Sequence, residues 1–206
     1  MNELDYISRS PKYASEVAPL IYDSAHELMQ FIFKNKHNAL QSLTKLNQNK
    51  LGHFSYLFSN VLLLQGKVVG VEIGFDKKQL KKQEFLGSLA LLLQSPVLIW
   101  RYLVFVVAPT LDSYIPDPSD DAYYINNIAV SPMFQRQGVG QLLIKNACLK
   151  AKQMGLCRLE LDVSKDNRQA INFYLKNGFS LVSESITSKL HQAYNLPVLI
   201  RMSKSL

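Results

Sequence analysis

Residues 123–140 read YYINNIAVSPMFQRQGVG, and this stretch decides the fold. Its first part, residues 123–130, is mostly apolar, aromatic or β-branched, which predicts a strand. An amphipathic helix is expected over residues 138–154, because apolar side chains recur there at steps of three and four residues. The alternation of apolar and polar residues over 156–163 then predicts a second strand. A strand, a helix and a strand in this order predict a β-α-β unit with two parallel strands.

The turn between the first strand and the helix carries QRQGVG at residues 135–140. Its two glycines let a bound group come close to the backbone, and the free N–H groups at a helix start attract phosphate oxygens. Arg136 adds charged donors. The pattern predicts a cradle for a pyrophosphate, although two glycines also occur in ordinary tight turns. It is not a Walker loop, because no Gly-Lys-Ser/Thr follows, and it lacks the third glycine of a dinucleotide-binding fingerprint.

A second motif, NRQAINFYLKNGF at residues 167–179, follows the second predicted strand. Asp166 or Asn167 is expected to cap a short helix that continues through Lys176. Taken alone, Tyr174 would be an ordinary core or surface aromatic residue, and Asn167 would be an ordinary helix cap.

Together, the two motifs closely resemble the acetyl-CoA core of the GNAT superfamily of acetyl-CoA-dependent N-acetyltransferases. The resemblance covers residues 123–179 and implies direct attack of an amine on the thioester, with no covalent enzyme intermediate. It implies that Tyr174 protonates the departing thiolate of coenzyme A, a role that a phenol of pKa about 10 can fill by proximity. It also implies the cosubstrate-binding residues: Ile128, Ala129 and Val130 along the pantetheine arm, Arg136, Gln137, Gly138, Val139, Gly140 and Gln141 at the pyrophosphate, and Asn167 near the pantetheine or acetyl group.

The sequence offers several candidates for the base that deprotonates the acceptor, since an ammonium is not nucleophilic. Asp162 matches the position of a glutamate base in the ribosomal-protein N-acetyltransferase branch, but a strand-end aspartate can equally bond to backbone or solvent. Another branch places its base at the position of Tyr124, where a tyrosine is a departure from the pattern. The alternatives, acting through water, are Asp120, Asp121 and Glu72.

The remaining sequence predicts the other elements of the sheet and its helices. Strands are expected at 4–8, 56–64, 67–75, 179–187 and 198–202, and helices at 11–33, 39–46 and 78–93. With the resemblance, the expected fold class is α/β (α+β): a GNAT-like mixed, mostly antiparallel central sheet flanked by helices, with a parallel β-α-β acetyl-CoA-binding core, in a single domain over residues 1–206.

Residues 76–108 are expected to be an apolar insertion between strands, and 85–108 are long enough to span a bilayer. Gln94, Pro96 and Arg101 argue against a membrane span, because a proline breaks a helix and a charge in the bilayer is costly. Ordinary core is the default expectation, and the alternatives are a wall of a hydrophobic acceptor pocket and a homodimer contact.

The composition is that of a globular chain, because 48% of its 206 residues are apolar, 19% are charged and the net charge is +7. Positive charge favours anionic partners, but the chain has no zinc-finger, RNA-recognition or helix-turn-helix pattern, so no nucleic acid partner is expected. Two cysteines and the absence of a secretory signal in residues 1–10 predict a cytoplasmic protein. No metal is expected, because no metal-ligand spacing involves the four histidines His26, His37, His53 and His191.

The sequence therefore predicts an acetyl-CoA-dependent N-acetyltransferase that acts on a primary amine. The acceptor is a small amine or a protein N-terminus or lysine: the match at Asp162 favours a protein, whereas residues 85–108 could close a small-molecule pocket. The alternative from another class is a non-catalytic acyl-CoA-binding regulatory module.

Overall fold

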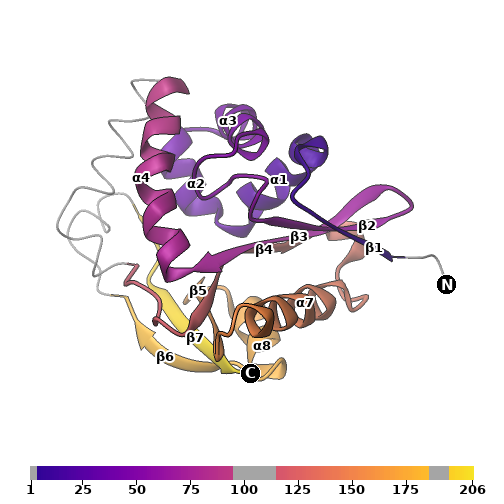
Figure 1. The fold of residues 1–206 in the computed structure, drawn as a ribbon, viewed down its shortest axis with the longest axis vertical. Helices are drawn as coiled ribbons and strands as arrows, with labels where there is room; N and C mark the ends of the chain where they lie inside the picture. Colours follow the sequence, from indigo (N-terminus) through magenta and orange to yellow (C-terminus); the bar gives the residue numbers. More distant parts are fainter. Residues whose placement is uncertain (1–3, 95–114, 186–194) are drawn as a thin grey trace.

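The computed structural model describes residues 4–94, 115–185 and 195–206. These residues form a seven-stranded sheet in the order β1-β2-β3-β4-β5-β7-β6, with helices on both faces (Figure 1). Among the described strands, β4 and β5 run parallel and every other neighbouring pair is antiparallel, so the predicted fold class is confirmed. The strands are β1 (Leu4–Ser8), β2 (Ser59–Leu64), β3 (Lys67–Asp76), β4 (Ala122–Val130), β5 (Arg158–Ser164), β6 (Ser180–Glu184) and β7 (Leu199–Ser205).

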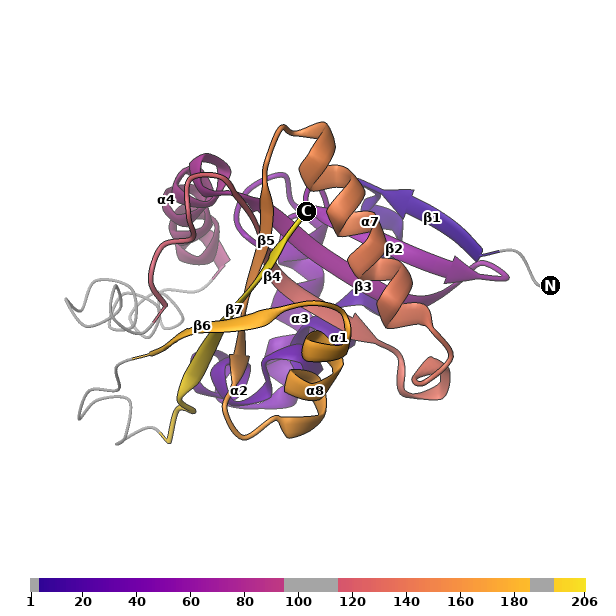
Figure 2. The ribbon, with the colours of Figure 1, turned by 90° about the horizontal axis from the view of Figure 1, so that it is seen from below.

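The helices form a layer on each face of the sheet (Figure 1). One face is covered by α1 (Ala14–Ser24), α2 (His26–Phe33) and α3 (Lys36–Gln48), and α4 (Lys77–Gln94) stands beside them. The other face carries α7 (Val139–Gln153) and α8 (Arg168–Lys176), which lie side by side (Figure 2). Short 3₁₀ helices, Pro11–Tyr13 and Pro132–Phe134, precede α1 and the QRQGVG turn.

Side chains alternate between the two faces of β3, so this strand contacts the helices on both sides of the sheet. Val71, Ile73 and Phe75 are fully buried in the core under α1–α3. Gly70 points to the other face, where a Cβ would lie only 3.0 Å from Cδ1 of Leu143 in α7. The missing side chain therefore lets α7 pack closely on the sheet, which sets the position of its N-terminal end.

A β-bulge in β4 opens the sheet at its centre. Ile73 of β3 pairs with Asn127 and Gly74 pairs with Ile125, so Asn126 has no partner on β3. The parallel pairing of β4 with β5 also ends at Ile125. A bulge bends the strand that carries it. Beyond the bulge, β4 diverges from β5. The edge of β4 that faces β5 is not paired with it there.

Most predicted elements are present, with shifted ends. α3 begins at Lys36, before the predicted residue 39, because Asn35 caps it by accepting a hydrogen bond from the Asn38 N–H at 2.9 Å. β7 extends to Ser205 because it pairs with β5 over the full length of that strand. The predicted helix at 78–93 is confirmed by α4, whereas the apolar segment after Pro96 lies outside the described residues. No helix in the described ranges is long and apolar enough to cross a membrane.

Candidate functional site

A cavity of about 750 Å³ lies where β4 and β5 separate. We call its two walls the α8 side and the α2 side. The α8 side is lined by residues 128–130, Gln135, Asn167 and Tyr174, and the α2 side is lined by His26, Glu27, Leu28, Met29, Ile32, His53, Phe54 and Leu80. The bulged half of β4 forms the floor between them, so the bulge creates the space for a ligand.

The first turn of α7 presents backbone N–H groups that no side chain caps. The first N–H groups of any α-helix have no acceptor within the helix. Gly138 precedes the helix at φ 84°, and a Cβ at this position would meet only Oε1 of Gln141, at 3.9 Å. The space in front of the helix is therefore open, and the N–H groups and the positive end of the helix dipole suit an anion there.

The second glycine of the turn has a different role. A Cβ on Gly140 would lie 3.0 Å from Cζ of Phe173 and 3.7 Å from Cγ2 of Val130. Gly140 therefore lets α8 approach α7, and a larger residue would push α8 and its neighbouring Tyr174 away. Gly138 keeps a binding space open, whereas Gly140 keeps two helices together.

Side chains of the turn hold its shape rather than fill it. Gln135 donates from Nε2 to the carbonyl of Val130 at 3.3 Å, and Gln137 donates from Nε2 to the carbonyl of Met133 at 3.0 Å. Arg136 has φ 61°, a left-handed conformation, and its side chain is exposed. The backbone of the turn is therefore the part that is free to hold a phosphate, with Arg136 at its edge. These residues fit the pyrophosphate cradle that the sequence predicts.

Tyr174 lies on α8, Asn167 directly precedes this helix, and both residues line the cavity. Tyr174 is 8% exposed and its ring contacts Phe173 and Phe179 edge-on. Burial raises the pKa of the Tyr174 phenol well above its usual value, so it keeps its proton at neutral pH. Asn167 caps α8, because its Oδ1 accepts from the Ala170 N–H at 3.0 Å. The cap occupies the oxygen of Asn167 and leaves its amide N–H groups for a ligand.

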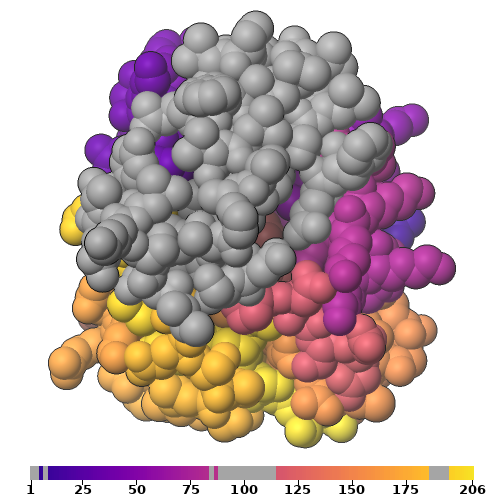
Figure 3. Space-filling view, turned by 90° about the vertical axis from the view of Figure 1, so that its left-hand side faces the viewer, coloured from indigo at the N-terminus to yellow at the C-terminus, as the bar shows by residue number. Residues whose placement is uncertain are grey.

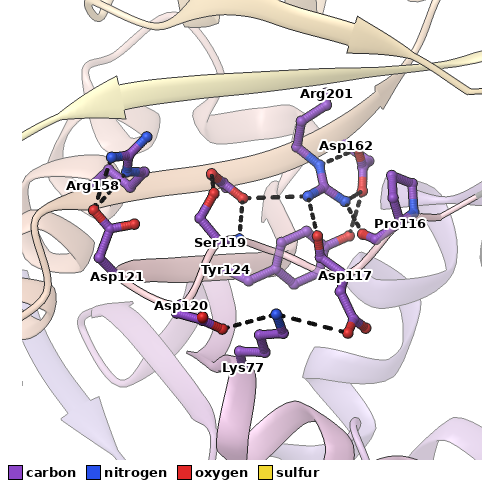
Figure 4. Close-up of polar contacts among 11 residues, drawn as sticks. Lys77, Pro116, Asp117, Ser119, Asp120, Asp121, Tyr124, Arg158, Asp162 and Arg201 are labelled. Atoms are coloured by element: carbon purple, nitrogen blue, oxygen red, sulfur yellow. Dashed lines mark hydrogen bonds and ion pairs between the residues drawn. The ribbon is translucent and has the colours of Figure 1, made fainter.

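Asp162 lies at the floor of the cavity and is held by two partners (Figure 4). Arg201 donates from Nε to Oδ1 at 2.7 Å and from Nη2 to Oδ2 at 2.8 Å. The Tyr124 hydroxyl donates to Oδ2 at 2.8 Å. Burial, followed by the nearby charge of Asp162, raises the pKa of Tyr124 well above its usual value. Tyr124 is thus a neutral phenol that lines the cavity and connects it to a carboxylate.

Arg201 also holds the segment before β4. Its guanidinium donates to the backbone carbonyls of Pro116, at 2.5 Å, and Asp117, at 3.4 Å, and pairs with Glu160 at 3.3 Å. Glu160 in turn accepts from the Ser119 hydroxyl at 2.6 Å. Figure 3 shows this segment at the surface between α4 and the C-terminal strands. One buried arginine therefore fixes both the floor of the cavity and part of its rim.

The alternative bases lie outside the lining of this cavity. Asp120 is exposed and pairs with Lys77 at 2.8 Å, and Asp121 pairs with Arg158 at 2.8 Å (Figure 4). Glu72 is fully buried and accepts hydrogen bonds from Asn60, at 2.6 Å, and from the Tyr123 hydroxyl, at 3.0 Å. Burial raises the pKa of the Glu72 carboxyl. Of the four carboxylates that the sequence offers as bases, Asp162 is therefore the one that reaches the cavity.

The α2 side is tied to β4 at the bulge. Asn127 donates from Nδ2 to the hydroxyl of Ser24, the last residue of α1, at 2.8 Å. The wall that follows carries the apolar side chains of Leu28, Met29, Ile32, Phe54 and Leu80 and the polar residues His26, Glu27 and His53. Its apolar part suits an apolar group of a ligand.

Sequence reasoning missed two residues of the cavity region, Arg201 and His53. Arg201 stands between apolar residues in a predicted strand, and a charge at a buried strand position signals an acidic partner. No signal in the sequence marks His53, because its role depends on helices and turns that are far apart in the chain.

Comparisons with known proteins agree with this geometry. The model of the Acetyltransferase (GNAT) family matches residues 98–179, the segment that carries both motifs. No curated protein matches the sequence. At 20% identity, the N-acetyltransferase from Staphylococcus aureus Mu50 has a TM-score of 0.74 over 97% of this chain and 99% of that chain. An acetyltransferase at 18% identity has a TM-score of 0.69 over 98% of both chains.

A third solved structure, Ard1 from Thermoplasma volcanium, is 18% identical, with a TM-score of 0.59 over 98% of this chain and 97% of that chain. At these identities the structural likeness shows a common fold. In the described ranges, no group of three His, Cys, Asp or Glu side chains could hold a metal ion.

Proposed function

Since the chain belongs to the GNAT superfamily and is an acetyl-CoA-dependent acyltransferase, we propose that it acetylates a small primary amine with an apolar body. The observation that carries this proposal is the cavity between β4 and β5, whose α2 side presents the apolar side chains of Leu28, Met29, Ile32, Phe54 and Leu80 beside the polar residues His26, Glu27 and His53. The alternative acceptor is a protein N-terminus or lysine, and the experiment below separates the two.

The α8 side binds acetyl-CoA, which supplies the activated acetyl group. The N–H groups at the start of α7 and Arg136 hold the pyrophosphate, because the turn is uncapped and open in front of Gly138. Residues 128–130 line the cavity along the edge that β4 frees beyond its bulge, so they pair with the pantetheine arm. The Asn167 amide donates nearby, because its oxygen is used by the helix cap.

Tyr174 is the acid that protonates the departing sulfur of coenzyme A. Tyr174 lines the cavity from α8, on the same side as the proposed pantetheine path. The raised pKa ensures that the phenol carries a proton at working pH. The same shift makes the proton harder to release, so transfer has to accompany the growth of charge on the sulfur rather than precede it.

Asp162 is the base, and Tyr124 carries the proton to it. Both Asp162 oxygens already accept hydrogen bonds, one of them from Tyr124. An acceptor ammonium that donates to the Tyr124 oxygen can pass its proton there, while the Tyr124 hydroxyl proton moves to Asp162. The amine becomes neutral and nucleophilic, the phenol is restored and the carboxylate takes up one proton. Arg201 positions the carboxylate throughout.

The proposal includes a cytosolic location, because both cysteines, Cys148 and Cys157, are unpaired thiols.

The test combines calorimetric titration with acetyl-CoA and an acetylation assay that measures thiol release. We expect saturable binding of acetyl-CoA, and release of thiol with small apolar amines such as phenethylamine. Peptides with free N-termini and lysines provide the comparison. Turnover with peptides and none with small amines would establish the protein acceptor instead. Binding of acetyl-CoA without turnover of any amine would contradict the catalytic proposal.

A further inference from the structure

The described residues that line the cavity carry charge of one sign. They include five of the 16 acidic residues of the chain and no lysine or arginine, although the chain has 23 basic residues and a net charge of +7. The five acidic residues are Asp23, Glu27, Asp117, Asp162 and Asp166. A cleft lined by one sign of charge concentrates ions of the opposite sign. The start of α7, proposed for the pyrophosphate, lies outside this lining, so the cavity itself favours a cation.

Two of these carboxylates have no cationic partner in the part of the chain that the structure describes. The other three form ion pairs: Asp162 with Arg201 at 2.7 Å, Asp23 with Lys36 at 3.7 Å and Asp117 with Lys81 at 3.0 Å. Glu27 and Asp166 are the two without such a pair, and both residues are exposed, so they lie where the cavity opens to solvent. An ammonium group of a ligand can pair with either of them.

Glu27 is the better placed of the two for the acceptor. It lies in the first turn of α2, the helix that also supplies Leu28, Met29 and Ile32 to the cavity wall. Asp166 lies just before α8, on the side proposed for coenzyme A. Glu27 therefore combines a free carboxylate with an apolar wall, and a ligand that suits both has a cationic end and an apolar chain.

A second observation indicates independently that the cavity takes up a polar ligand. Tyr174 is 8% exposed, and its hydroxyl makes no hydrogen bond with any residue that the structure describes. Among the described residues, only Asn47 Oδ1 and His53 Nε2 are fully enclosed side-chain atoms without a partner, so the Tyr174 hydroxyl keeps accessible surface. A buried hydroxyl without a partner is costly. Because Tyr174 lines the cavity, a polar group of a ligand there can supply the partner.

We propose that the acceptor is a linear diamine whose distal ammonium pairs with the Glu27 carboxylate while its other nitrogen is acetylated beside Tyr124 and Asp162. This inference rests on the proposed function and sharpens its substrate class, because it adds a second positive charge to the apolar body. The reacting ammonium gives its first proton to Asp162 through Tyr124. The neutral nitrogen then forms a bond to the acetyl carbon, the carbon–sulfur bond breaks and Tyr174 protonates the sulfur. The proton released from the new amide restores the Tyr174 hydroxyl, and the product is a mono-N-acetyl diamine that keeps its distal ammonium.

The test uses pairs of primary amines of equal length that differ in whether the distal group is charged. 1,4-Diaminobutane is compared with 4-aminobutan-1-ol, and 1,6-diaminohexane with 6-aminohexan-1-ol. For at least one pair, we expect kcat/KM to be about 10-fold higher for the diamine, because its two equivalent ends give a factor of about two and one exposed ion pair gives about five. The difference should appear in KM rather than kcat, and it should shrink at about 0.5 M salt, since salt screens exposed charges.

The variant Glu27→Gln keeps the shape of the side chain and removes its charge. We expect the ratio of kcat/KM within the discriminating pair to fall from about 10 to about 2. Asp166→Asn is the matched control, because Asp166 is the other exposed carboxylate of the lining without a cationic partner among the described residues, and it should leave the ratio unchanged. A ratio of about 2 in the parent protein, or a ratio that falls no further in Glu27→Gln than in Asp166→Asn, would overturn the inference.

A binding readout keeps this inference separate from the proposed function. In calorimetric titration of the protein with coenzyme A present, at least one diamine should bind more tightly than the amino alcohol of equal length, and Glu27→Gln should remove this preference. Tighter binding of the diamine without turnover of any amine would refute the catalytic proposal and support the cation site at Glu27. Turnover of the amines without any preference for a diamine would support the catalytic proposal and refute the cation site.

Discussion

The two sides of the cavity are built in different ways. The α8 side comes from one continuous stretch, from β4 through α7 and β5 to α8, and its binding groups are mainly backbone. The α2 side is assembled from segments far apart in the chain: α2, the turn at His53 and the start of α4. The difference teaches that the site proposed for the cosubstrate is encoded locally, whereas the site proposed for the acceptor depends on tertiary packing.

Gly138→Glu should have the largest effect, and it should impair the α8 side alone. The space in front of Gly138 is open, so the side chain fits but brings a negative charge to the site proposed for the pyrophosphate. Like charges at a binding site cost several kcal/mol, so we expect acetyl-CoA affinity to fall about 1000-fold. Calorimetric titration measures this change.

Gly66→Glu is the matched control, because Gly66 also has positive φ, at 76°, and a Cβ at this position would have nothing within 4 Å. It lies in the β2–β3 hairpin turn, far in the chain from α7. Both variants introduce the same backbone strain and the same charge. Equal loss of affinity in the two would show that strain or net charge, and not the cradle, is responsible.

On the α2 side, His53 predicts a pH-dependent loss of stability. The unfolded chain takes up a proton on this histidine below about pH 6.5, whereas the folded protein does so only below about pH 4. Stability is therefore lost as the pH falls through this window, by up to about 3 kcal/mol. Denaturant unfolding at several pH values should show that His53→Phe removes this part of the loss. A parent and a variant with parallel pH profiles would mean that the ring is already protonated or accessible.

On the α8 side, Tyr174→Phe removes the proposed proton donor and keeps the ring contacts with Phe173 and Phe179. We expect kcat to fall roughly 100-fold while acetyl-CoA affinity is kept, since proton transfer contributes to the chemical step and not to binding. Tyr13→Phe, in the core under α1 and outside the cavity, is the control. An unchanged kcat in Tyr174→Phe would remove the assignment of the acid.

The residues in these predictions show how much of the fold and of the candidate site could be predicted from the sequence. The QRQGVG turn and the Tyr174 motif lie in regular elements with periodic patterns, so the fold and the α8 side could be predicted. The sequence also placed Asp162 on β5, but its bidentate pair with Arg201 joins residues from strands that only the folded sheet makes neighbours. His53 carries no pattern, because its meaning comes from burial against α4. The bulge at Asn126 was not predicted either, since it depends on the register between strands.

Tyr124→Phe tests the link between the two sides and has the smallest expected effect. The variant keeps the ring beside Phe75 and under Arg201, whose guanidinium lies 5.3 Å from the ring centre, and leaves the Arg201–Asp162 pair intact. A water molecule can replace the lost hydroxyl, so we expect kcat to fall only about 10-fold. The raised pKa keeps Tyr124 protonated. Deprotonation of Tyr124 should therefore not lower the rate of the parent protein between about pH 8 and 10. A relay predicts that the variant loses kcat at every pH in this range while KM for acetyl-CoA is unchanged. If Tyr124 had only a structural role, the variant would show an unchanged kcat or weaker binding of acetyl-CoA. Either result would mean that Asp162 takes up the proton without Tyr124.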